Sequence, residues 1–225
     1  MNPADTPPAR NREIARLIIG FRKFRERFFS NSVDDLSIYQ RLASSGQSPK
    51  TMLIGCSDSR VDPAILTGAS PGDLFVVRNV ANLVPPCEKS TVGFHGTSTA
   101  LEFAVDTLKV ENIIVLGHRQ CGGIQALMRG ATDNKASFMG QWMSIAEDAR
   151  KVVMEQHGTQ DSDTQWRMAE MESIKVSLRN VRSFPFVRQA IDTRQLTVIG
   201  VYFDLEKGEL WTYDEVAEQF RQVEL

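Results

Sequence analysis

Long hydrophobic runs are absent from this sequence of 225 residues. No run approaches the ~18 consecutive apolar residues that a membrane-spanning helix needs. The first eight residues are polar and rich in proline, and they lack the apolar region of a secretory signal. Residues 10–27 hold many arginines, as a transit peptide does, but Asp5, Glu13, Glu26 and the scarcity of serine argue against one. We therefore expect a cytoplasmic protein with no membrane partner.

The net charge is also small, and cysteines are few. The formal net charge is −2, so the chain has no overall field that would attract nucleic acid, and we expect no nucleic-acid partner. Three cysteines are an odd number, and no Cys-x-x-Cys pair occurs, which fits a reducing compartment better than a disulfide framework. Apolar residues at 42% and charged residues at 24% are ordinary values for a globular protein, and the length suffices for a large core.

The hydrophobic pattern predicts an α/β fold. Two helical patterns come first, over residues 12–29 and 33–43. Short apolar runs then predict buried strands at 51–55, 74–77, 113–117 and 196–203, with an edge strand at 210–213. Helical patterns lie between them, over residues 99–108, 124–128, 139–153, 165–181 and 185–191. We expect a single domain over residues 1–225, in which helices flank a mostly parallel central sheet of four strands plus an edge strand, with an N-terminal helical arm over residues 1–30.

Two short blocks carry the chemistry: Cys56-Ser-Asp-Ser-Arg60 and His118-Arg-Gln-Cys121-Gly-Gly. Each begins at the carboxyl end of a predicted parallel strand, where open α/β sheets bind their ligands, so the fold can bring them together. Zn²⁺ takes thiolate and imidazole ligands, and a site with three protein ligands keeps a position for water. Cys56, His118 and Cys121 are therefore candidate zinc ligands.

Other interpretations of the thiols stay open at this point. Cys56 and Cys121 can be small buried apolar residues or a redox pair. Cys87 as a fourth ligand would make the site structural, although an ordinary free thiol suits its loop better. The zinc deaminases also use one histidine and two cysteines, but their His-x-Glu and Pro-Cys-x-x-Cys motifs are absent here.

Asp58 and Arg60 form a carboxylate–guanidinium pair next to Cys56. Such a pair is often only structural. Beside a metal, however, a bound Asp58 would occupy the water position, whereas an Asp58 held by Arg60 leaves it open and can accept a hydrogen bond from that water.

Cys-x-Asp-x-Arg followed by His-x-x-Cys resembles the signature of the β-class carbonic anhydrases. The resemblance extends over roughly residues 15–215 and includes segments 46–49, 71–86 and 108–118. It implies the reversible hydration of CO2 to bicarbonate and a proton by zinc-hydroxide attack on CO2. It also implies roles for single residues: Cys56, His118 and Cys121 bind Zn²⁺, Asp58 and Arg60 contact the zinc-bound water, Gln47 and the Gly122 amide bind substrate, and Phe75, Val80 and Phe103 form the apolar wall of the CO2 site.

Two positions indicate the subtype that the chain resembles. Plant-type members carry tyrosine where this chain has Phe103, so the hydroxyl is lost here. Some bacterial members carry a tryptophan where this chain has Leu53, as part of an inhibitory bicarbonate site. We expect a plant-like, open site at neutral pH, in which Asp58 binds the metal only in a closed form.

The family also implies a homodimer or higher homo-oligomer, with the N-terminal helix reaching over a neighbouring subunit. Two further functions stay as alternatives. One is a related zinc hydrolase acting on CS2 or COS, and the other is a non-catalytic zinc-binding protein on the same fold.

Overall fold

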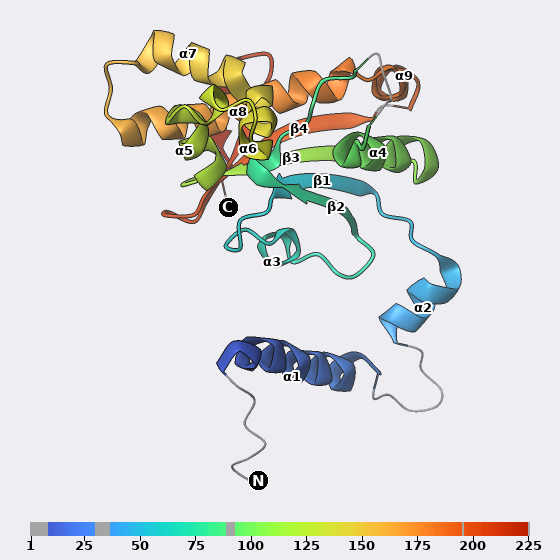
Figure 1. Ribbon diagram of the computed structural model, residues 1–225. Helices are drawn as coiled ribbons and strands as arrows, with labels where there is room; N and C mark the ends of the chain where they lie inside the picture. The colour runs from blue at the N-terminus through green and yellow to red at the C-terminus, as the bar shows by residue number, and fades with distance from the viewer. Residues whose placement is uncertain (1–8, 30–36, 89–92, 195, 225) are drawn as a thin grey trace. The chain divides into compact units, whose positions relative to one another are not determined.

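The computed structural model describes residues 9–29, 37–88, 93–194 and 196–224 (Figure 1). The chain divides into two compact units, Met1–Gln47 and Ser48–Leu225. The boundary falls later than the end of the arm expected over residues 1–30, and the single-domain organisation stays a prediction.

The N-terminal unit holds α1 (Ala9–Phe29) and α2 (Ile38–Ser45). Ser37 begins α2 with a capping box, in which its side chain accepts from the Gln40 amide while the Gln40 side chain accepts from the Ser37 amide. The ring of Tyr39 on α2 contacts an aromatic cluster on α1, made of Phe24, Phe28 and Phe29. The expected second helix over 33–43 begins at Ile38, and residues 33–36 lie outside the described residues.

The second unit is built on one sheet in the order β2-β1-β3-β4-β5-β6. The strands are β1 (Thr51–Cys56), β2 (Leu74–Asn79), β3 (Asn112–His118), β4 (Thr197–Asp204), β5 (Glu209–Asp214) and β6 (Gln219–Gln222). The first four in this order pair in parallel, and β5 and β6 pair antiparallel. The expected α/β fold with a mostly parallel sheet is confirmed. The sheet also has a sixth strand, so the strand expected at the edge, β5, lies inside it.

Helices pack around this sheet, joined by short irregular turns (Figure 1). The helices are α3 (Pro63–Thr67), α4 (Gly96–Glu102), α5 (Gly122–Met128), α6 (Phe138–Met143), α7 (Glu147–His157), α8 (Ser162–Ser183) and α9 (Pro185–Arg194). The single helix expected over 139–153 is interrupted by a 3-10 turn, Ser144–Ala146, and the one expected over 99–108 ends in a π-helical turn, Phe103–Thr107.

The largest cluster of buried apolar side chains joins one face of the sheet to α8. Met52 and Ile54 of β1 belong to this cluster together with Ile174 of α8, whereas Leu53 lies in a separate, smaller cluster. This alternation follows from the two-residue period of a strand. Gly117 allows α8 to approach β3 closely, because a Cβ atom there would lie 2.6 Å from Cδ1 of Ile174. The packing thus fixes β3, and with it the carboxyl end at His118.

Candidate metal centre

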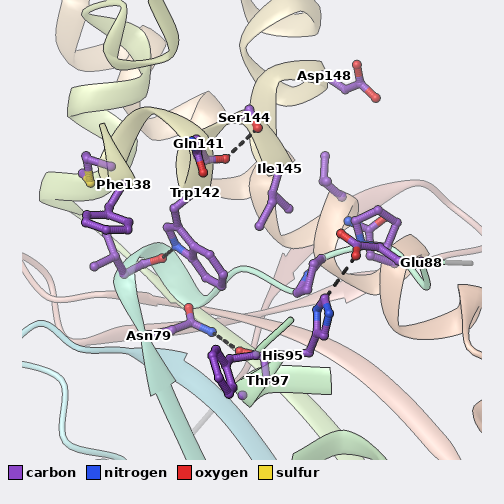
Figure 2. A pocket seen from close by; sticks show the side chains of 18 of the residues that line it. Asn79, Glu88, His95, Thr97, Phe138, Gln141, Trp142, Ser144, Ile145 and Asp148 are labelled. Atoms are coloured by element: carbon purple, nitrogen blue, oxygen red, sulfur yellow. Dashed lines mark hydrogen bonds and ion pairs between the residues drawn. The ribbon is translucent and has the colours of Figure 1, made fainter. Parts of the chain in front are cut away.

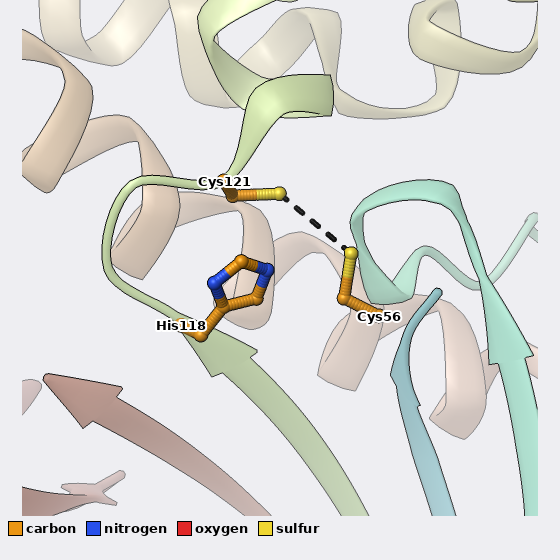
Figure 3. Close-up of side chains that lie close together, drawn as sticks. All are labelled: Cys56, His118 and Cys121. Atoms are coloured by element: carbon orange, nitrogen blue, oxygen red, sulfur yellow. Dashed lines mark hydrogen bonds between the residues drawn. The ribbon is translucent and has the colours of Figure 1, made fainter. Parts of the chain in front are cut away.

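Cys56, His118 and Cys121 come together at the carboxyl edge of the parallel sheet (Figure 3). Cys56 ends β1, His118 ends the neighbouring strand β3, and Cys121 immediately precedes α5. Their ligand atoms all lie within 4.8 Å of one another, and the two sulfurs are 3.9 Å apart. All three residues are buried. The three expected ligands therefore share one enclosed site.

The ring of His118 presents one nitrogen to this site. Its Nδ1 lies 2.8 Å from the carbonyl oxygen of Arg119. Because a carbonyl oxygen only accepts, Nδ1 carries the proton and Nε2 keeps its lone pair. Among the described residues, the buried Nε2 has no hydrogen-bond partner. A metal ion satisfies this atom, so the donor set fits a metal.

The two thiols interact strongly with each other. The hydrogen bond with Cys121 lowers the pKa of Cys56 to about 4, against the opposing effect of burial. The same interaction raises the pKa of Cys121, and burial raises it further. The two sulfurs are 3.9 Å apart, so one thiol can donate to the other, and a thiophilic divalent cation can take the place of the proton between them.

Asp58 and Arg60 form the expected pair beside the ligands. Arg60 donates from Nε to Asp58 Oδ1 at 2.9 Å and from Nη2 to Oδ2 at 2.7 Å. This bidentate bond, with a further bond from the Arg60 amide, holds the pKa of Asp58 well below its usual range. Asp58 Oδ2 lies 4.0 Å from His118 Nε2. An ionised carboxylate is thus held next to the metal position by its own arginine.

Arg78 anchors the segment that carries Cys56 and Asp58, a role that sequence reasoning missed. From β2, its guanidinium donates to the carbonyl oxygens of Cys56 at 2.9 Å and Asp58 at 2.6 Å. It also bonds the carboxylate of Asp62, which caps α3. A buried run followed by a charged residue is common at strand ends, so spacing alone does not reveal this role.

The segment from His118 to Cys121 is held at each residue. The Arg119 amide donates to Phe203 O at 2.9 Å, and Arg60 Nη2 donates to Gln120 O at 2.9 Å. Gln120 has a φ of 59°, in the left-handed region that costs most residues about 1–2 kcal/mol. The Cys121 amide donates to Oε1 of Glu170 on α8 at 3.1 Å. These bonds hold a strained turn in the shape that directs His118 and Cys121 to one point.

Val80 and Gly122, two of the expected substrate residues, lie near the metal ligands. Gly122 follows Cys121 directly and begins α5. Val80 follows the carboxyl end of β2 and approaches the next glycine of α5 so closely that a Cβ on Gly123 would lie 2.8 Å from Val80 Cγ1. The turn after Val80 is also strained, with φ of 64° at Ala81 and 49° at Asn82.

A groove of about 1210 Å³ is lined in part by Val80. Figure 2 shows Trp142, Phe138 and His95 around this groove. Trp142 and Phe138 of α6 and His95 before α4 line it. The indole nitrogen of Trp142 donates to the Val80 carbonyl oxygen at 2.8 Å, so Trp142 helps to fix the turn. An aromatic residue in a helical pattern usually belongs to the core, so the sequence pattern around Trp142 does not reveal this contact.

Phe75 and Phe103, also expected at the substrate wall, contact each other rather than the metal ligands. Their ring centroids are 5.8 Å apart. In the β1–β2 register Phe75 pairs with Met52, whereas Cys56 pairs with Asn79. Four residues of strand correspond to ~13 Å, so within one chain this aromatic pair lies well away from the metal centre. Gln47 belongs to the N-terminal unit, and its role in substrate binding stays a prediction.

The fold and the site together define a zinc-dependent enzyme whose three metal-binding side chains lie at the carboxyl edge of a parallel sheet. No described helix is long and apolar enough to cross a membrane. Residues 51–210 match the carbonic anhydrase family. The chloroplastic β carbonic anhydrase 5 of Arabidopsis thaliana is 37% identical over 211 residues, which are 91% of this chain and 69% of that protein. The chain therefore belongs to the β class of the carbonic anhydrases.

Solved structures agree with this assignment. The structure of the β-carbonic anhydrase CcaA has a TM-score of 0.84 and 32% identity, and covers 95% of this chain and 93% of that one. Tetrameric β-carbonic anhydrases from the ascomycete Sordaria macrospora give a TM-score of 0.67 and 27% identity, over 95% and 94% of the two chains.

Proposed function

We propose that this chain catalyses the reversible hydration of CO2 to bicarbonate and a proton. One observation carries the proposal: the lone-pair nitrogen of His118 and two thiols meet in a buried site, 4.0 Å from a carboxylate that its own arginine holds. A non-catalytic zinc site has no need of this second pair. Zn²⁺ bound to Cys56, His118 and Cys121 supplies a Lewis acid that makes a water molecule acidic near neutral pH.

The chain's own residues then orient the reactants. Because its pKa is well below the usual range, Asp58 is ionised at neutral pH and can only accept hydrogen bonds. It accepts from the attacking water and so directs a lone pair of that water towards the carbon of CO2. Arg60 holds Asp58 through two parallel bonds, which keeps the carboxylate off the metal in the open form.

Substrate placement falls to Gly122, Gln47 and Val80 in this proposal. The Gly122 amide and the Gln47 side chain hydrogen-bond the oxygens of the substrate, and Val80 excludes water from one side. Phe75 lies too far back along β2 to complete this wall in the same chain, and Phe103 contacts Phe75 rather than the ligands. We therefore assign their contribution to the site of a second copy of the chain.

A homo-oligomer follows from this arrangement, and the Sordaria relatives are tetrameric. In the described part of α1, the side chains of Ile14, Leu17, Ile18 and Phe21 are each more than half exposed. A helix in water rarely leaves such a stripe uncovered. We propose that α1 is the arm that packs on the neighbouring subunit. The cytoplasmic location remains a proposal based on the sequence alone, and the Arabidopsis relative is chloroplastic.

Stopped-flow CO2 hydration at pH 7 and 8.5, with zinc content measured on the same sample, tests the activity. Cys121→Ser should lose both zinc and activity. Cys87→Ser is the matched control, because Cys87 is exposed and lies outside the ligand cluster, and it should retain both. A zinc-loaded protein without activity at either pH would refute the proposal. Activity on CS2 or COS alone would favour the hydrolase instead.

A further inference from the structure

Glu170 is a buried carboxylate to which the reaction assigns no part. It lies in the middle of α8, 49 residues after Cys121 in the sequence, and its side chain is 1% exposed. A buried carboxylate is costly unless donors surround it. The donors around Glu170 are therefore the first indication of what it does.

Each oxygen of Glu170 accepts one hydrogen bond. Oε1 accepts from the Cys121 amide at 3.1 Å, and Oε2 accepts from the Tyr202 hydroxyl of β4 at 2.9 Å. Nη1 of Arg119 lies 3.8 Å from Oε2, and the same guanidinium also pairs with Asp163 and Glu206. The Tyr202 hydroxyl is buried with the carboxylate and holds its plane, so that Oε1 faces the Cys121 amide. The network thus joins α8 and β4 to one main-chain atom of a metal ligand.

The amide nitrogen of Cys121 lies next to a strained part of the main chain. Cys121 follows the left-handed Gln120, and the buried Cys121 amide lies at the start of α5, outside the bonding of the helix. Without Glu170 this amide would be buried and unpaired, and the strained turn would relax. A shift of the Cys121 main chain moves its sulfur relative to Cys56 and His118.

We propose that Glu170 is a positioning residue for the metal centre: it accepts the hydrogen bond of the Cys121 amide and thereby fixes the place of the Cys121 sulfur. This inference rests on zinc binding by the three ligands and deepens the proposed function. Outer residues that orient metal ligands typically change metal affinity about 10- to 100-fold when they are replaced.

Three variants separate this role from a general contribution to stability. Glu170→Gln keeps an acceptor oxygen for the Cys121 amide. Its NH2 group faces the Tyr202 hydroxyl, which can rotate and accept a hydrogen bond instead of donating one. Glu170→Leu has similar volume but no acceptor. Leu178→Ala is the matched control, because Leu178 is buried on the same helix two turns further on and packs in the apolar cluster away from the ligands.

The measurement is the rate at which zinc leaves the purified zinc-loaded protein to a coloured chelator. The absorption spectrum of the Co²⁺-substituted protein gives a second readout, because its thiolate bands report ligand geometry. We expect Glu170→Leu to release zinc about 10- to 100-fold faster with altered Co²⁺ bands, and Glu170→Gln to stay within about threefold of the unmodified protein. Should Glu170→Leu fail to fold, Tyr202→Phe, which frees the carboxylate to rotate, should show a smaller change in the same direction.

The proposal is overturned if Glu170→Leu, or Tyr202→Phe in its place, keeps both the release rate and the Co²⁺ bands. It is also overturned if Leu178→Ala, at equal loss of stability, reproduces both changes, or if Glu170→Gln behaves like Glu170→Leu. CO2 hydration enters none of these readouts. A failure of the proposed activity in the unmodified protein is therefore distinct from a failure of this inference.

Discussion

Alanine at position 123 tests how rigidly α5 is packed against the turn that carries Val80. A Cβ atom on Gly123 would lie 2.8 Å from Val80 Cγ1 and 3.0 Å from Ala81 Cβ. Ala81 is fully buried and already has a strained φ of 64°, so the turn has little room to move away. Overpacking of this kind typically costs about 1–3 kcal/mol. Alanine regains at most about 1 kcal/mol from its higher helix propensity, so we expect a net loss of stability.

The neighbouring residue supplies the control for this experiment. A Cβ on Gly122 would meet nothing within 4 Å, although Gly122 lies in the same turn of the same helix. Gly122→Ala should therefore keep its stability or gain slightly, while Gly123→Ala should unfold at lower urea concentration. For a chain of this size each kcal/mol corresponds to about 2–4 °C in Tm. Equal stability of the two variants would show that the turn yields, and would refute the rigid packing inferred here.

Three further predictions concern the dyad, the sheet and the buried tyrosine. Arg60→Lys loses the two parallel hydrogen bonds that hold Asp58. The rate of CO2 hydration at pH 7 should therefore fall about 10- to 100-fold while the zinc content stays unchanged. An unaltered rate would contradict the role of Arg60. Gly117→Ala should destabilise the fold by about 1–3 kcal/mol, measured by urea unfolding, because its Cβ would lie 2.6 Å from Cδ1 of Ile174. The same substitution should cost less in an Ile174→Ala background, and an equal cost in both backgrounds would argue against the contact. Burial, with the charge of Glu170, raises the pKa of Tyr202 in the folded state. Above pH ~10 the tyrosine therefore ionises in the unfolded chain but not in the folded one, and the folded state loses stability as the pH rises further. The free energy of unfolding should therefore fall less steeply above pH ~10 in Tyr202→Phe than in the unmodified protein, and parallel curves would contradict this.

The buried strands were predictable because each combines a short apolar run with a sharp end. Thr51–Cys56 and Asn112–His118 match the predicted runs to within a residue at each end. Strand β6 was missed because Gln219–Gln222 is short and three of its four residues are polar, with only Phe220 packing on the core. The helix expected over 139–153 kept its apolar period through the 3-10 turn at Ser144–Ala146, so periodicity did not reveal the interruption.

The metal ligands were predictable for a different reason. His118 ends one strand, Cys121 follows it by three residues, and Cys56 ends another strand. All three are residue types that bind zinc, and all three lie where parallel strands end, so the two signals point to the same site. The supporting residues carry no such signal. Glu170 of α8, 49 residues further along the chain, accepts from the Cys121 amide, and Tyr202 of β4, 81 residues further along, donates to Glu170. Only the packing of α8 against β3 and β4 brings these residues together.

The pairing of β1 with β3 has a consequence for how the chain folds. Gly55 lies opposite Leu116, which places Cys56 beside the end of β3 where His118 emerges. A slip of one residue would shift Cys56 by ~3.3 Å and turn its side chain to the other face of the sheet. Zinc–ligand bonds of about 2.0–2.3 Å do not tolerate such an error. A chain with misaligned strands cannot bring the three ligands to one point, so the retention of zinc depends on the correct alignment of β1 with β3.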